Sequence, residues 1–79
     1  MDSNGTMIYH FVALLDCYLS RDKVQLKNVY NDKGEEVRKI VIFMARDIRD
    51  KGGEPGDKII FKAKRPNGDF PFDFKVMNV

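Results

Sequence analysis

Short segments with the character of β-strands, separated by turn signals, recur along this 79-residue chain and limit its fold more than any other feature. Residues 24–30 and 58–64 alternate apolar and polar side chains, and residues 37–45 and 70–79 are rich in β-branched or aromatic residues. Turns with glycine, asparagine or proline follow at 31–34, 52–57 and 66–68. At least four strands are therefore expected.

The first apolar segment, residues 7–19 (MIYHFVALLDCYL), fits two periods. As a strand it places Phe11, Ala13 and Leu15 on one face, whereas as a helix it forms a stripe from Ile8 to Leu19. Tyrosine, phenylalanine and valine favour the strand, and the Ala-Leu-Leu centre favours the helix. The β-rich remainder favours a strand, and a helix 7–19 on a four-stranded antiparallel sheet, an α+β fold, stays open as the alternative.

The later segments carry more specific expectations. Residues 45–51 predict one or two helical turns that end at Gly52. The segment 37–45 is apolar on both faces after Lys39, which predicts a central strand covered on both sides. In the last segment Phe70, Phe72 and Phe74 share one face, and the latter two are expected in the core. Pro71 lacks an amide donor, so this strand is expected at a sheet edge.

The order is strand, strand, strand, short helix, strand, strand. Five strands in about 70 residues cannot bury themselves as a flat sheet, so we expect a mainly β fold, a small five-stranded and partly open barrel. Residues 1–6 are expected to be a flexible N-terminus and residues 7–79 a single domain. This order of elements, with "GDKIIFKA" launching the fourth strand after a Gly-Asp turn, resembles small OB-fold proteins over residues 8–79.

The OB resemblance implies a binding site for single-stranded nucleic acid. OB barrels bind single strands across strands two and three, between the loops that join strands one to two and four to five. The net charge of +2 is mild, but residues 58–75 hold five basic and two acidic side chains. Cations that would neutralise phosphates are expected at Arg21, Lys23, Lys27, Arg38, Lys62, Lys64 and Arg65. Rings that would stack on bases are expected at Tyr30 and Phe70, and Asn67 completes the predicted site.

Catalysis finds little support in the sequence, and we expect neither an enzyme nor a cofactor or metal site. His10 and Cys17 lie seven positions apart, on opposite faces of a strand, and are too few for a zinc site. We expect His10 at the surface and Cys17 in the core. Asp69 and Asp73 are about 13 Å apart along a strand, too far for a glycosidase pair.

The alternative function is a small protein-interaction module, such as a phage- or plasmid-type inhibitor or accessory subunit. An available edge strand recruits a partner, or a second copy, by strand addition, and Met77 would then lie in the interface. The single cysteine forms no internal disulfide, which favours a reducing compartment, and we expect a cytoplasmic protein. The longest apolar run, residues 7–15, is shorter than the about 20 residues that span a bilayer, so no membrane contact is expected.

Overall fold

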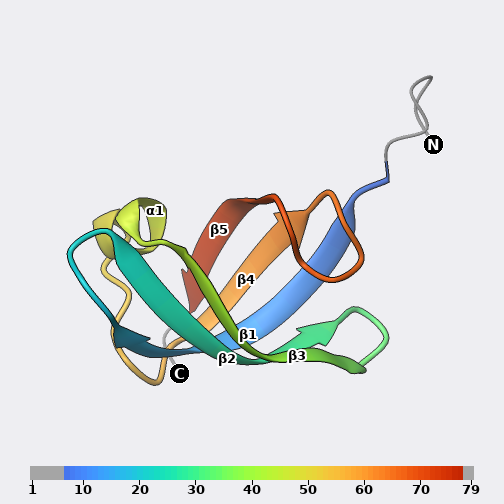
Figure 1. Cartoon of the computed structure of the whole chain (residues 1–79), viewed down its shortest axis with the longest axis horizontal. Coiled ribbons are helices and arrows are strands. Elements are labelled where there is room, and N and C mark those ends of the chain that lie inside the picture. Colours follow the sequence, from blue (N-terminus) through green and yellow to red (C-terminus); the bar gives the residue numbers. More distant parts are fainter. Residues whose placement is uncertain (1–6, 78–79) are drawn as a thin grey trace.

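A computed structural model describes residues 7–77, which form one strongly curled sheet and one short helix (Figure 1). The prediction of a mainly β fold with a helix between the third and fourth strands is confirmed. The segment that fitted either a strand or a helix is a strand, so the α+β alternative is wrong. Residues 1–6, for which flexibility was predicted, lie outside the described part. The elements are β1 (Tyr9–Tyr18), β2 (Lys23–Asn31), β3 (Glu36–Met44), α1 (Arg46–Asp50), β4 (Lys58–Ala63) and β5 (Pro71–Met77).

The sheet has the order β3-β2-β1-β4-β5, and every neighbouring pair is antiparallel. It does not close, because no ladder joins β3 to β5 within the described residues. Each edge strand is antiparallel to its neighbour, β2 or β4, and that neighbour is antiparallel to β1. The edge strands β3 and β5 therefore run in the same direction as β1 and as each other. We call the gap between these two edge strands the seam. As predicted for the strand that begins at Pro71, β5 lies at an edge.

Aromatic rings fill the inside of the curl. Phe61 on β4 is fully buried, and its ring stacks on Phe11 at 5.3 Å between centroids. Phe43 meets the Phe61 ring edge-on at 5.2 Å, and Phe74 packs on it at 5.6 Å. Aliphatic side chains from all five strands and α1 complete this core. The two rings that come from the edge strands, Phe43 and Phe74, thus rest on one central ring.

The strand at 37–45 is not the central strand that its apolar composition predicted. It is β3, an edge strand, and nothing in the described part of the chain covers its outer face. Ile40, Ile42 and Met44 are 47%, 51% and 67% exposed. Burial against the rest of residues 7–77 therefore does not explain their apolar character.

The phenylalanines near the last strand do not share one face. Phe70 and Asp73 have positive φ angles of 58° and 57°, and the β4–β5 register shifts between Ile60 and Lys62. The shift places one extra residue on β5, and such a bulge resets the alternation of side chains. Phe74 is buried as predicted, but Phe72 stands opposite Lys62 and is only half-buried, outside the core.

A second irregularity corrects the prediction for Cys17. The β1–β2 register shifts between Leu15 and Cys17, so the inward alternation of Phe11, Ala13 and Leu15 does not continue. Cys17 is half-buried and lies outside the core, where a core position was predicted. His10 is exposed, as predicted.

The short helix α1 is held in place by contacts to the end of β1 and the loop after it. The Tyr18 hydroxyl donates to the Gly53 carbonyl at 2.6 Å, just after the helix. Arg49 lies 4.2 Å over the Tyr18 ring and donates to the Ser20 carbonyl at 3.1 Å. Ile48 is fully buried beneath them. These contacts fix α1, and with it the end of β3.

Removing the Tyr18 hydroxyl is expected to destabilise the fold by about 1 kcal/mol, the net value of one hydrogen bond. Burial raises the pKa of Tyr18 above 10.0, against the opposing effect of Arg49. A raised phenol pKa contributes stability that is complete below pH 10.0 and is lost as pH rises through the folded-state pKa. Urea unfolding should show that Tyr18→Phe is less stable than the unsubstituted chain at neutral pH. As pH rises into the alkaline range, the variant should lose less stability than the unsubstituted chain does, because it has no phenol at this position.

Tyr9→Phe is the matched control for this prediction, because among residues 7–77 the Tyr9 hydroxyl has a single hydrogen-bond partner, the exposed Met7 sulfur at 3.8 Å. Tyr9→Phe should leave the stability at neutral pH unchanged. Equal stability of the two variants at neutral pH would show that the bond to Gly53 contributes nothing.

Candidate functional site

The sequence-predicted site residues lie in separate parts of the molecule. The β1–β2 loop with Arg21 and the β4–β5 loop with Lys64 and Arg65 lie at opposite ends of the sheet, the left and right ends of Figure 1. Between these loops run β2 with Lys23 and Lys27, and β3 with Arg38. The structure therefore aligns the residues along a path rather than gathering them in one cluster.

Carboxylates already pair with three of the predicted cations. Lys27 lies 3.8 Å from Asp16, Arg38 lies 3.3 Å from Asp69, and Lys62 lies 3.1 Å from Asp73. The hydrogen bond and charge of Lys62 lower the pKa of Asp73, which therefore stays ionised. All of these groups are partly exposed, so each pair is weak. A phosphate would nevertheless have to displace a carboxylate at each of these positions.

The β4–β5 loop presents one aromatic ring beside a cation. Phe70 is 62% exposed, and the Arg65 guanidinium lies 5.5 Å from its ring centroid. Asn67 is occupied within the loop, where it accepts from the Asp69 amide at 3.1 Å and donates to the Asp69 carboxylate at 3.2 Å. Gly68, in the turn predicted at residues 66–68, takes a left-handed conformation with φ of 94°. The loop therefore offers a ring and cations, but not the Asn67 side chain.

Tyr30, the other predicted stacking ring, lies elsewhere. It pairs with Val12 across the β1–β2 ladder and lines a shallow hollow of about 350 Å³ with Leu14, Asn28 and Lys58. Among the described residues no ring contact joins Tyr30 to Phe70. The two predicted stacking rings thus do not form one platform.

The feature that the sequence interpretation missed is the outer row of β3. Ile40, Ile42 and Met44, which we call the β3 ridge, stand opposite Lys27, Gln25 and Lys23 on β2. Gln25 donates to Asp16 at 2.7 Å, so the neighbouring row is polar and ordered. The signal in the sequence was the apolar run itself, which was assigned to a strand covered on both sides.

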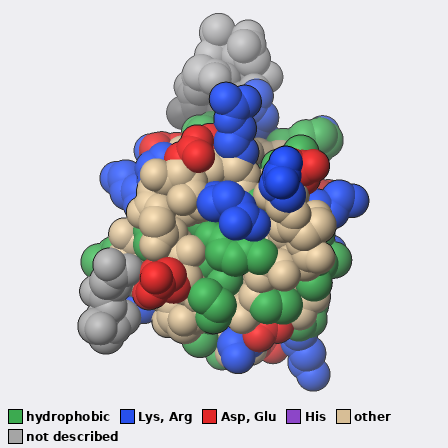
Figure 2. Space-filling model, turned by 90° about the vertical axis from the view of Figure 1, so that its left-hand side faces the viewer, with side chains coloured by type: hydrophobic (Ala, Val, Ile, Leu, Met, Phe, Trp, Pro, Cys, Tyr) green, Lys and Arg blue, Asp and Glu red, His purple; other side chains and the backbone are tan. Residues whose placement is uncertain are grey.

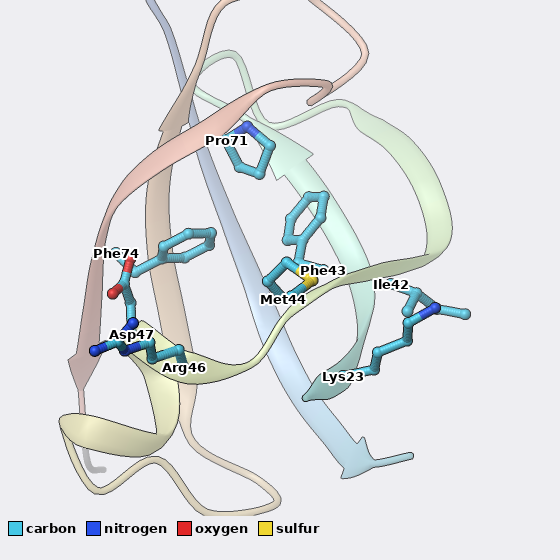
Figure 3. Close-up of a pocket in the computed structure, with 8 residues that line it drawn as sticks. All are labelled: Lys23, Ile42, Phe43, Met44, Arg46, Asp47, Pro71 and Phe74. Atoms are coloured by element: carbon cyan, nitrogen blue, oxygen red, sulfur yellow. The ribbon is translucent and has the colours of Figure 1, made fainter. Parts of the chain in front are cut away.

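A pocket of about 590 Å³ opens at the seam beside this ridge (Figure 3). The Phe43 and Phe74 rings, with centroids 5.9 Å apart, both lie in the space between β3 and β5. Side chains from β2, β3, α1 and β5 line it: Lys23, Ile42, Phe43, Met44, Arg46, Asp47, Pro71 and Phe74.

The seam is also hollow farther along β3. A second hollow of about 350 Å³ is lined by Ile40, Val41, Ile42 and Phe43, and by Arg38 with its partner Asp69. The Arg38–Asp69 ion pair thus links β3 to the β4–β5 loop at the far end of the seam. The two hollows share Ile42 and Phe43 in their linings, so they adjoin along β3 between this ion pair and α1.

The charged side chains that line the pocket carry a net positive charge. Lys23 and Arg46 line it together with one carboxylate, Asp47. None of these three side chains forms an ion pair within residues 7–77. Viewed from the end that carries α1 and the β1–β2 loop, hydrophobic side chains gather at the centre, with Lys and Arg side chains above them (Figure 2).

Other kinds of site find no support in the described part of the chain. No group of three His, Cys, Asp or Glu side chains lies close enough to hold a metal ion among these residues. The one helix described, α1, is too short to cross a membrane. Comparison of the chain with protein-family models, curated proteins and solved structures found no match.

Proposed function

We propose that this chain is a non-catalytic protein-interaction module that binds its partner through the β3 ridge and the pocket at the seam. The observation that supports this proposal most is the exposure of Ile40, Ile42 and Met44 in one row beside an apolar pocket. Single exposed apolar residues are ordinary, but a contiguous patch rimmed by polar side chains is typical of a binding surface. Lys23, Gln25 and Lys27 supply such a rim.

The composition of the ridge also supports a protein partner. Interface cores are enriched in methionine and aromatic residues and depleted of charge. The pocket provides one methionine, Met44, and two aromatic rings, Phe43 and Phe74, whose centroids lie 5.9 Å apart. Burying an exposed isoleucine or methionine side chain contributes up to about 1.5–3 kcal/mol, so the loss of two ridge residues should lower the affinity measurably.

The barrel itself is proposed to be OB-like. Its strand order and the position of α1 between β3 and β4 resemble the OB-fold, with the ladder between β3 and β5 left unformed. In that fold, ligands bind on the face of strands two and three. The β3 ridge lies on the third strand and the polar row opposite it on the second, so the resemblance and the proposed surface agree.

Single-stranded nucleic acid is the second candidate, and the contact of Arg65 with the exposed Phe70 ring is the observation in its favour. An exposed ring and a cation suit a stacked base and its phosphate. The path between the two loops, however, is lined by the aliphatic β3 ridge, and stacking requires rings. With Lys27, Arg38 and Lys62 paired to carboxylates, this function ranks second.

A random 12-residue peptide library displayed on phage, selected against the full chain, tests the proposed function. We expect the selected peptides to lose at least about tenfold in affinity when Ile42 and Met44 are both changed to lysine, since tenfold corresponds to about 1.4 kcal/mol. Leu19→Lys is the matched control, because Leu19 is 49% exposed and lies outside the pocket. Affinities are measured by fluorescence anisotropy of labelled peptides.

The same assay with a labelled single strand of about 20 nucleotides separates the two candidates. Failure of the selected peptides to respond to the ridge variant, together with salt-dependent binding of the single strand, would overturn the proposed function. In that case Lys64→Glu with Arg65→Glu should weaken binding of the single strand. The proposal would also be overturned if neither the selected peptides nor the single strand bound at the ridge.

A further inference from the structure

We propose that the seam takes up one extended polypeptide segment, which adds as a strand to the free edge of β3 and runs antiparallel to it. This inference rests on the proposed function and specifies the partner. The segment carries apolar side chains for the pocket and one or two carboxylates in its N-terminal half, which meet Lys23 and Arg46.

The free edge of β3 is the first support for strand addition. β3 pairs only with β2, so the backbone groups of its other edge lack a ladder partner within the described residues. Unpaired edges recruit strands from other chains through main-chain hydrogen bonds. The stretch from Arg38 to Met44 would support about 20 Å of added strand, at about 3.3 Å per residue.

The direction of the segment follows from the directions of β3 and β5. Because both run parallel to β1, direct closure of the seam would require a parallel ladder. A segment running the opposite way forms the antiparallel ladder with β3, which is slightly more stable per residue. Its N-terminal half then lies beside the C-terminal end of β3, where Met44 is followed by Arg46 on α1.

The side chains of the seam define the chemistry of the segment. Successive residues of a strand point to opposite faces, so alternate residues would face the Phe43 and Phe74 rings or lie beside Ile40 and Ile42. Apolar residues suit both positions. Lys23 and Arg46 exceed the single carboxylate of Asp47 in the pocket, and an acidic residue of the segment would balance the excess.

N-methylation of a selected peptide tests the strand addition directly. An added strand bonds to the edge through alternate residues, so methyl groups on one set of alternate amides should abolish binding and those on the other set should spare it. Strand addition would be overturned if N-methylation of either set of amides had the same effect on binding. The proposed function would still stand if that peptide also lost affinity for the variant with Ile42→Lys and Met44→Lys.

Charge reversal tests the chemistry and direction of the segment. Lys23→Glu with Arg46→Glu should weaken the selected peptides at least about tenfold. Lys33→Glu with Lys64→Glu makes the same change in net charge at exposed lysines outside the pocket and should weaken them less than twofold. Carboxylates enriched in the N-terminal half of selected peptides support the antiparallel direction, and their absence or enrichment in the C-terminal half overturns it.

A second copy of the chain is the competing occupant of this edge. Sedimentation equilibrium of the chain alone should show a monomer. A dimer that Ile42→Lys with Met44→Lys dissociates would assign the edge to self-association and overturn the proposed partner.

Discussion

Replacing Phe61 by alanine is expected to bring the chain close to its unfolding midpoint at 25 °C. Phe61 is fully buried, and the rings of Phe11, Phe43 and Phe74 all pack on it within 5.6 Å. Truncation of a buried phenylalanine costs about 3–5 kcal/mol. A domain of this size has a total stability on the order of 5 kcal/mol, so the change removes most of it. Circular dichroism and urea unfolding measure the effect.

Two further variants keep this prediction testable if the alanine variant cannot be purified. Phe61→Leu retains most of the volume and should remain folded with a loss of about 1–2 kcal/mol. Phe70→Ala removes an equally large side chain that is 62% exposed, and its effect should stay within about 0.5 kcal/mol. Similar losses for Phe61→Leu and Phe70→Ala would contradict the central role of Phe61.

Replacing Gly53 by alanine is expected to destabilise the fold by about 2–3 kcal/mol, although it adds only one methyl group. An added Cβ would lie 2.7 Å from Ile48 Cγ2, 3.1 Å from the Ile48 carbonyl oxygen and 3.2 Å from Leu15 Cδ1. Overpacking of this kind typically costs about 1–3 kcal/mol. The Gly53 amide also donates to that Ile48 carbonyl at 3.0 Å, so α1 cannot move away without losing the bond.

Gly34→Ala is the comparison for Gly53→Ala. A Cβ at Gly34 meets nothing within 4 Å, and its φ of +81° confines the cost to the backbone, about 1–2 kcal/mol. The Gly53 variant should be the less stable of the two in urea unfolding. It should also weaken the selected peptides, because α1 carries Arg46, whereas Gly34→Ala should not. A more stable Gly53 variant would show that α1 shifts freely.

The sequence predicted the local elements well because their signals are local. The period of two in 58–64 and the turn at Gly34, whose φ is 81°, depend on neighbouring residues alone. The bulges at Cys17 and Asp73 were not predictable in this way, because a bulge is defined by the register of a partner strand. One extra residue opposite Ile60 and Lys62 was enough to move Phe72 out of the core.

The candidate site was harder to predict than the fold, for a reason that β3 makes plain. A strand that is apolar on both faces is buried on both where other elements cover the two sides of its sheet, and is exposed on its outer face in a single curled sheet. The amino-acid pattern is the same in both cases. Ile42 and Met44 could be recognised as surface residues only once the structure showed one sheet whose outer face they share. The ion pairs of Lys27 and Arg38 likewise join residues whose contact depends on the tertiary fold.

The pairing of β1 with β4 has a consequence for how this chain folds. Ladders within β1–β2–β3 and within β4–β5 join strands that follow one another, whereas β1 and β4 are separated by two strands and α1. Contacts between distant segments form slowly, because a long loop must close before they are gained. The β4–β5 hairpin would therefore dock last on a preformed three-stranded meander, and only this docking brings Phe74 to Phe43.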